Sequence, residues 1–323
     1  MITCYKTGDD NKTVQVASPE PGTWISVVDP TPEESSWLEQ GIGVLPEFVR
    51  AALDEEETSH IDFDEDANQT LVIVDYPTHE DADKDGDSTR LQYITLPISV
   101  VFIPQSGIIV TVTLQECPIV QDMAEGRVRQ LNTRLRTRFL LLMLLRISQS
   151  YLIHLRHIDR LSSKTEQNLY GSMRNEELLQ MLSLEKSLVF FSTSLKSAEV
   201  TLNKIMHGHL ISLYEDDADL MEDVMIEVHQ AQEMCNIYSN ILSGTMDAYA
   251  SVISNNLNIV MKVLTVLTIV MAIPNIVFGF FGMNVNLPFA GAPFADSWIF
   301  PTVITIAACL IAALIFKRKG LWG

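Results

Sequence analysis

The stretch NNLNIVMKVLTVLTIVMAIPNIVFGFFGMN, residues 255–284, carries the strongest structural signal in the chain. Its part from Val263 to Phe281 has no charged residue, and 19 helical residues at about 1.5 Å each nearly cover a hydrocarbon core roughly 30 Å thick. Residues 217–262 contain no proline and one glycine, Gly244, so nothing in the sequence interrupts a helix. We therefore predict one long helix, residues 216–281, that begins as a stalk in water and ends as a first membrane span.

Small and polar residues recur along one face of this predicted helix. Alternating steps of four and three residues keep them on one side, and in a membrane such a stripe faces protein or water rather than lipid. A helix-packing seam would also use small residues and hydroxyls, but it does not explain two asparagines on one line, so we favour a pore. The stripe consists of Asp247, Ser251, Ser254, Asn258, Met261, Thr265, Thr268, Ala272, Asn275, Gly279 and Gly282.

A second uncharged stretch follows at residues 298–316, and we predict a second membrane span over 298–317. Basic residues begin directly after it, at Lys317, and the connecting loop 282–297 has neither lysine nor arginine. The positive-inside rule then places the tail 318–323 and the N-terminus in the cytoplasm. The N-terminus has no apolar run, so we expect no signal peptide. The sequence predicts a multi-pass protein of the plasma (inner) membrane.

The tripeptide Gly282-Met283-Asn284 lies just after the first predicted span. Together with the run from Asp247 to Val270 before it and the basic tail, it resembles the signature of the CorA family of divalent metal-ion transporters. This close resemblance covers about the last third of the chain. It implies a homopentameric channel whose first spans line the axis, with Gly282, Met283 and Asn284 as the selectivity filter. It implies transport of Mg²⁺, with Co²⁺ and Ni²⁺ as further substrates, and no enzyme activity.

The chemistry of the ion explains why an asparagine suits this place. Mg²⁺ sheds its six waters reluctantly, so a selective mouth should bind the hydrated ion. The amide oxygen of Asn284 accepts hydrogen bonds from coordinated water without adding a fixed charge. The loop after it has one acid, Asp296, where the family often has several, which leaves cation choice to the asparagine ring. Further along the axis we expect polar rings at Asn275, Asn258 and Asp247, and a hydrophobic constriction at Met261 and Leu264.

Composition agrees with a cation transporter and excludes other classes. The chain has 22 Lys and Arg against 41 Asp and Glu, a net charge of −19, which repels nucleic acid and concentrates cations. No GxxxxGK loop, GxSxG elbow or HExxH motif is present, so neither nucleotide-driven pumping nor hydrolysis has a residue basis. The four cysteines have no paired spacing, which favours a reducing compartment.

Strand-like and helix-like segments alternate in the N-terminal part, and we predict an α+β cytoplasmic domain over residues 1–122. Thr31, Pro32 and Glu34 form a capping-box pattern for a short helix, and residues 46–53 predict a second. Residues 123–215 predict an antiparallel helix pair with a break near 170–172. The segments rich in β-branched residues, expected to be strands, are 13–17, 23–30, 71–77, 92–104 and 108–115.

Acidic clusters offer candidate metal sites. The resemblance implies a regulatory Mg²⁺ site in which Asp223 on one stalk pairs with acids of a neighbouring subunit. The positions expected to be acidic read Arg50 and Ala51 here, and the nearby run Asp54, Glu55, Glu56 and Glu57 is the candidate replacement. A solvated charge run remains the alternative. Residues 81–87 resemble the opening of an EF-hand loop, but Gln92 stands where a bidentate Glu is needed, which favours an acidic hairpin loop.

The histidines are less informative. His154 and His157, and His207 and His209, lack the cysteines or repeated spacing of a zinc site, so we interpret them as surface residues. Two other functions stay open at this point. One is a zinc transporter of the same architecture, against which the GMN tripeptide argues. The other is a membrane-anchored cytoplasmic metal sensor without ion flux.

Overall fold

The structure is a computed structural model of the full chain. It forms two compact units, Met1–Thr245 and Met246–Gly323, and helix α6 (Ala218–Phe281) contributes residues to both. Asn284 and the acidic run 81–87 lie outside the described residues. The residues that the structure describes are 1–9, 12–79, 91–172, 175–207, 211, 214, 217–283 and 298–319.

The first unit is built on a seven-stranded sheet with the order β2-β1-β3-β7-β6-β5-β4. Only β3 and β7 are parallel, and the other neighbours are antiparallel. The central strands are buried along both faces, as their β-branched sequences predict. The strands are β1 (Ile2–Thr7), β2 (Thr13–Val16), β3 (Thr23–Val28), β4 (His60–Asp64), β5 (Gln69–His79), β6 (Tyr93–Ile103) and β7 (Ile108–Thr113).

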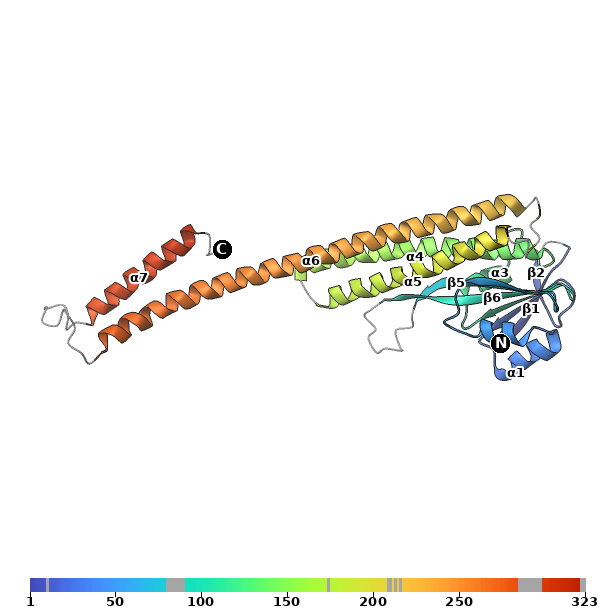
Figure 1. Ribbon diagram of the computed structural model, residues 1–323, viewed down its shortest axis with the longest axis horizontal. Helices are drawn as coiled ribbons and strands as arrows, with labels where there is room; N and C mark the ends of the chain where they lie inside the picture. Colours follow the sequence, from blue (N-terminus) through green and yellow to red (C-terminus); the bar gives the residue numbers. More distant parts are fainter. Residues whose placement is uncertain are drawn as a thin grey trace. The chain divides into compact units, whose positions relative to one another are not determined.

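Helices cover both faces of the sheet, so the expected α+β domain is confirmed (Figure 1). On one face, α1 (Pro32–Trp37), the π-helical turn η1 (Leu38–Ile42) and α2 (Pro46–Ala52) enclose a core that includes Phe48 and Ile73. The predicted capping box is present, because the Thr31 hydroxyl accepts the Glu34 amide and the Glu34 carboxylate accepts the Thr31 amide. The other face is covered by α3 (Pro118–Ala124), α4 (Arg136–Ser172) and α5 (Asn175–His207).

Helix α4 shows why apolar length alone does not identify a membrane span. By length and hydropathy α4, α6 and α7 (Ile299–Arg318) could each cross a bilayer. In α4, however, Phe139, Leu141 and Met143 are fully buried within the first unit. The Tyr151 hydroxyl donates to the Asp75 carbonyl of β5 at 3.0 Å, which fixes α4 to the sheet. Helix α4 is therefore a core helix, whereas α6 and α7 expose their apolar residues.

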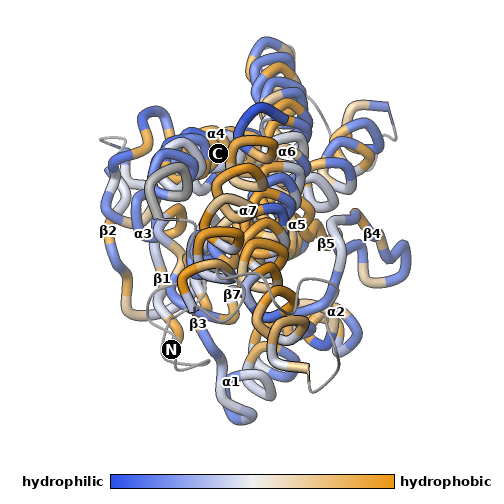
Figure 2. Tube along the Cα trace, turned by 90° about the vertical axis from the view of Figure 1, so that its left-hand side faces the viewer, coloured by the Kyte–Doolittle hydropathy of each residue, from blue (hydrophilic) through white to orange (hydrophobic). Residues whose placement is uncertain are grey.

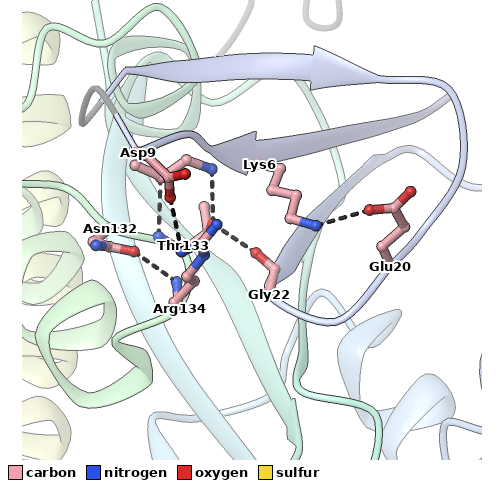
Figure 3. A network of polar contacts seen from close by, with 8 residues as sticks. Lys6, Asp9, Glu20, Gly22, Asn132, Thr133 and Arg134 are labelled. Atoms are coloured by element: carbon pink, nitrogen blue, oxygen red, sulfur yellow. Dashed lines mark hydrogen bonds and ion pairs between the residues drawn. The ribbon is translucent and has the colours of Figure 1, made fainter.

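The connection between α3 and α4 is held to the sheet by a polar network (Figure 3). The Thr7 and Thr133 backbone amides each donate to the other residue's hydroxyl, at 3.0 and 3.1 Å. The Thr133 hydroxyl in turn donates to the Gly22 carbonyl at 2.6 Å, and Arg134 pairs with Asp9 at 3.2 Å. Thr133 is fully buried, so its three bonds satisfy polar groups that would otherwise be costly to bury.

Helix α6 begins at Ala218, and its first turns bury an apolar face that includes Val224, Val228 and Ala231. The Gln232 side-chain amide donates to the Leu195 carbonyl at 3.1 Å and to the Glu199 carboxylate at 2.9 Å. These bonds join the stalk to the helix layer that lies on the sheet.

Candidate pore helix and metal-binding residues

The predicted stripe lies on α6 with its side chains largely exposed in the single chain. All its described members except the half-buried Ala272 are exposed. The hydroxyls of Ser251, Thr265 and Thr268 donate to carbonyls four residues earlier, at 3.1, 2.7 and 2.8 Å. Their protons are used inside the helix, and their oxygens can still accept hydrogen bonds from water. Leu264, which was predicted to form the constriction together with Met261, is exposed as well.

The opposite side of α6 contacts α7. Val266 is 6% exposed, and Val270 and Val277 are half-buried. A helix advances about 100° per residue, so these three side chains fall within about 40° of each other. Thr268 and Asn275 fall about 160° and 180° from Val266 by the same rule. Thr268 and Asn275 therefore face away from α7.

Pro274 explains one detail of this helix contact. Proline has no amide proton, so the carbonyl four residues earlier, that of Val270, loses its helical partner. The Cys309 thiol of α7 lies 3.8 Å from this carbonyl oxygen and donates to it. Nearer the end of α6, the rings of Phe281 and Phe300 meet edge to face at 5.9 Å. A backbone carbonyl inside a membrane needs a hydrogen-bond partner when a proline removes its helical one. Here the Cys309 thiol of α7 is that partner for the Val270 carbonyl. Hydrophobic residues dominate α7 (Figure 2).

Gly282 follows the last residue of α6, and its lack of a side chain matters there. Its amide donates to the Phe278 carbonyl at 2.9 Å. A Cβ at position 282 would lie 3.0 Å from that same carbonyl oxygen, closer than ordinary contact distance. Glycine therefore permits the tight helix end that leads to Met283, which is exposed. Asn284 and the loop with Asp296 lie outside the described residues.

The regulatory candidates do not meet within one chain. The run Asp54–Glu57 follows α2 on one side of the sheet, and Asp54, Glu55 and Glu56 are exposed. Asp223 lies exposed on α6, beyond the α4 and α5 layer on the other side (Figure 1). The Asp54 carboxylate accepts the Glu56 amide at 3.0 Å, and Glu57 lies 3.6 Å from His60. Among the described residues no group of three His, Cys, Asp or Glu side chains could hold a metal ion.

The remaining sequence candidates divide between described and undescribed residues. The EF-hand-like run 81–87 and His209 lie outside the described part. His207 is exposed and bonds the Asn203 carbonyl at 3.1 Å. His154, by contrast, is half-buried beside Tyr93, with ring centroids 5.4 Å apart, so the surface interpretation is wrong for this histidine. Tyr93 belongs to β6 and is distant from His154 in the sequence, so the spacing of the histidines could not indicate this contact.

Buried titratable groups in the first unit are structural. Burial raises the pKa of Asp75, which the Ser194 and Ser59 hydroxyls partly offset. Burial also raises the pKa of the Cys117 and Cys235 thiols to about 11. The Cys235 thiol donates to the Leu188 carbonyl at 3.2 Å. These cysteines are protonated at neutral pH and lack the thiolate character of a reactive site.

Comparison with known proteins identifies the family. The family model described as "CorA-like Mg²⁺ transporter protein" matches residues 20–318. The chain belongs to this family. It is therefore a divalent-cation transporter of the membrane and not an enzyme, and Mg²⁺ is the substrate for which the family is described.

Individual relatives agree with the family match. The cobalt/magnesium transport protein CorA of Methanocaldococcus jannaschii is 27% identical over 307 residues, which are 92% of this chain and 90% of that protein. The cobalt/magnesium transport protein CorA of Thermotoga maritima is 30% identical over 149 residues, 42% of this chain and 41% of that protein. The solved structure of the M. jannaschii CorA magnesium transporter shares the fold, with a TM-score of 0.81, 23% identity and 99% and 98% of the two chains covered.

Proposed function

We propose that this CorA-family chain forms a homopentameric channel that carries Mg²⁺ into the cell down its electrochemical gradient. Co²⁺ and Ni²⁺ are the proposed secondary substrates. The membrane potential suffices as a driving force, because 100 mV is worth about 2.3 kcal/mol per charge and so about 4.6 kcal/mol for a divalent ion. This corresponds to more than three decades of concentration gradient.

The proposal rests on the difference between two opposite faces of α6. The face with Val266 and Val270 is occupied by α7, and the face with Thr268 and Asn275 is not occupied by any described residue of the chain. Polar groups at membrane depth are costly unless they contact protein or water. Five copies of α6 around an axis would place every Thr268 and Asn275 on a water-filled path.

The filter is proposed at Gly282, Met283 and Asn284, at the outer end of this path. A ring of asparagine amides would accept hydrogen bonds from the water shell of the ion. Toward the cytoplasm the exposed side chains of Leu264 and Met261 would form the constriction that gates by dewetting. The other stripe residues supply oxygen acceptors between these points.

We further propose that cytoplasmic divalent cations gate the channel between subunits. Asp223 and the run Asp54–Glu57 are exposed, but they lie on opposite sides of one first unit. Hard cations need several oxygen ligands, so Asp223 of one subunit would share an ion with Asp54–Glu57 of its neighbour. Cations bound there would hold the stalks together at high internal Mg²⁺.

The proposed membrane arrangement has both termini in the cytoplasm. It consists of the α/β domain 1–122, the helix pair 123–215, the stalk and first span 216–281, the external loop 282–297, the second span 298–317 and the tail 318–323. Lys317, Arg318 and Lys319 support this orientation through the positive-inside rule.

Ion uptake into proteoliposomes tests the proposal. Purified wild type should carry Mg²⁺ and Co²⁺ when the potential is inside negative, and Asn284→Ala should abolish uptake while the assembly keeps its size. Asn203→Ala is the matched control, because this exposed asparagine bonds a carbonyl within α5 and belongs to the first unit. Uptake of Zn²⁺ alone would instead support a zinc transporter, and no uptake of any ion would support a membrane-anchored sensor.

A further inference from the structure

Four basic residues gather at one end of the helix pair formed by α6 and α7. Lys262 directly precedes the uncharged run of α6, and Lys317, Arg318 and Lys319 follow the last apolar residue of α7. They are all the lysines and arginines of residues 246–323, and all four side chains are exposed. The positive charge of the second unit is therefore confined to one end of its two helices.

Contacts between the helices place two of these residues at one level. The Cys309 thiol of α7 reaches the Val270 carbonyl of α6, and the phenylalanine contact described above lies nearer the loop, so the helices run antiparallel. Lys262 precedes Val270 by eight residues, or about 12 Å of helix. Lys319 follows Cys309 by ten residues, or about 15 Å in the same direction. The two lysines therefore lie within about 3 Å of the same level along the pair.

The same two side chains lie on the facing sides of the two helices. At about 100° per residue, Lys262 lies about 40° from Val266, the buried residue of α6 on the α7 side. Lys319 lies about 40° from Thr305, which is buried on the α6 side of α7. The Lys319 amide donates to the Ile315 carbonyl at 3.1 Å, so the helical turn continues to this residue. We call Lys262 and Lys319 the inner pair.

The other two basic residues point elsewhere. Lys317 and Arg318 lie about 120° and about 140° from Thr305, on sides of α7 that face away from α6. We call them the outer pair. The inner and outer pairs carry the same charge at nearly the same level, and they differ in direction.

The inner pair has no acidic side chain close to it along the chain. After Asp247 the sequence has one acid up to residue 323, which is Asp296. Asp247 lies about 22 Å before Lys262 on α6, and Asp296 precedes α7, at the opposite end from Lys319. The undescribed residues 320–323 contain no acid, and no ion pair between described residues includes either lysine. Within residues 246–323 the two ammonium groups therefore face each other without an acidic side chain between them.

We propose that the inner pair binds the phosphate of one anionic phospholipid, such as phosphatidylglycerol. The inference rests on the proposed two-span arrangement, in which the uncharged runs of α6 and α7 end at this level, beside the lipid headgroups. Basic pockets between membrane helices on the cytoplasmic side bind anionic headgroups. Each ammonium group has three donors, so two of them can share the oxygens of one phosphate. Exposed apolar side chains such as Val263 and Leu314 offer contact to acyl chains, which free phosphate lacks.

This site is separate from the proposed pore. The side chain of Lys262 is turned about 120° from Thr268 and about 140° from Asn275, so it lies outside the proposed pore lining. Lipid binding is measured without ion flux. A chain that binds phosphatidylglycerol but carries no ion would refute the channel and leave this site standing, and the reverse result would refute only the site.

Native mass spectrometry of the full-length protein in a nonionic detergent tests the inference. Dioleoylphosphatidylglycerol, dioleoylphosphatidylcholine and inorganic phosphate are added separately, and the bound molecules are counted per chain. The wild type should bind phosphatidylglycerol more tightly than phosphatidylcholine. Lys262→Gln/Lys319→Gln should bind phosphatidylglycerol about 25-fold more weakly, because each basic residue near an anionic surface contributes about 1 kcal/mol.

Two control variants separate a built site from general attraction to positive charge. Lys317→Gln/Arg318→Gln removes the same charge from the outer pair and should weaken binding by less than about fivefold, because these charges are solvated and screened. Lys186→Gln/Lys204→Gln, at exposed positions of α5 in the first unit, should leave binding unchanged. Conversion of both inner-pair lysines to arginine keeps the charge and should preserve binding.

Each outcome decides the proposal. Loss in the inner-pair variant that clearly exceeds loss in the outer-pair variant supports the site. Equal losses in these two variants would overturn it, as would equal binding of the two lipids by the wild type. Inorganic phosphate that binds as tightly as phosphatidylglycerol would overturn the lipid assignment. Size-exclusion profiles and thermal melts check that every variant folds, which the exposed positions of the substituted side chains lead us to expect.

Discussion

Replacing the buried Phe191 should lower the thermal stability of the first unit much more than replacing its exposed neighbour Phe190. Phe191 of α5 is fully buried, and its ring contacts Tyr151, Tyr93 and His154 at centroid distances of 5.1, 6.2 and 6.4 Å. These rings come from α4 and β6, so Phe191 joins three elements. Its neighbour Phe190 is 42% exposed.

Phe191→Ala should cost about 3–5 kcal/mol, because the substitution leaves a cavity among aromatic rings. Unfolding entropy of about 2.1 cal/mol/K per residue gives about 0.5 kcal/mol/K for the first unit. The expected fall in Tm is therefore about 6–10 °C. Phe190→Ala should lower Tm by no more than about 2 °C, since an exposed side chain loses little on truncation.

The assay is thermal unfolding of the purified full-length protein, followed by far-ultraviolet circular dichroism at one heating rate. Phe191→Leu is an intermediate variant that refills most of the cavity, and it should recover more than half of the lost Tm. Equal shifts for Phe190→Ala and Phe191→Ala would refute the packing described for α5. So would a negligible shift for Phe191→Ala.

Three further predictions concern the first unit and the stalk. Because burial raises the pKa of Asp75 above its ordinary 3.8, the folded state binds the proton more tightly, and stability falls as pH rises through the window above 3.8. The Tm of Asp75→Asn relative to wild type should therefore rise with pH in melts, and a constant difference would exclude this titration. Cys117 and Cys235, with pKa values of about 11, should resist alkylation at neutral pH until the chain is denatured, as mass spectrometry can show; rapid native labelling would contradict their burial. Gly43→Ala should lower stability by about 1–2 kcal/mol because its φ is +87°, whereas Gly244→Ala, in a helix with open space at Cβ, should not lower it; equal melting shifts would count against this assignment.

Local signals in the sequence predicted much of the fold. Signals that involve only residues near one another in the chain were read correctly. The structure has the capping box at Thr31 and the strands β5, β6 and β7 where the sequence indicates them. Strands β1 and β4 were missed. The segment ITCYKT of β1 has Lys6 and no clean alternation, and it is a strand because β2 and β3 pair with it on either side. Edge strand β4 is likewise short and polar.

At the candidate sites the sequence could not predict contacts between segments that are distant in the chain. The period of the stripe placed Thr268 and Asn275 on one side of α6, but the side that α7 occupies is shown by contacts in the structure, such as that of Cys309 with Val270. The inner pair of lysines was not predicted, because spacing along one helix does not show which side of it the other helix occupies. The acidic candidates Asp54–Glu57 and Asp223 were predicted from resemblance, and they remain a proposal that concerns two subunits.

Accessibility of single cysteines along α6 tests the central claim most directly. In a Cys309→Ala background, cysteines introduced singly at Thr268 and Asn275, and as controls at Val266 and Val270, are exposed to a hydrophilic thiol reagent during Mg²⁺ uptake. A water-filled path lined by the stripe predicts rapid modification and block of uptake at Thr268 and Asn275, with neither at the two valine positions. Equal modification at all four positions, or modification at the valine positions alone, would contradict an axial path along this face.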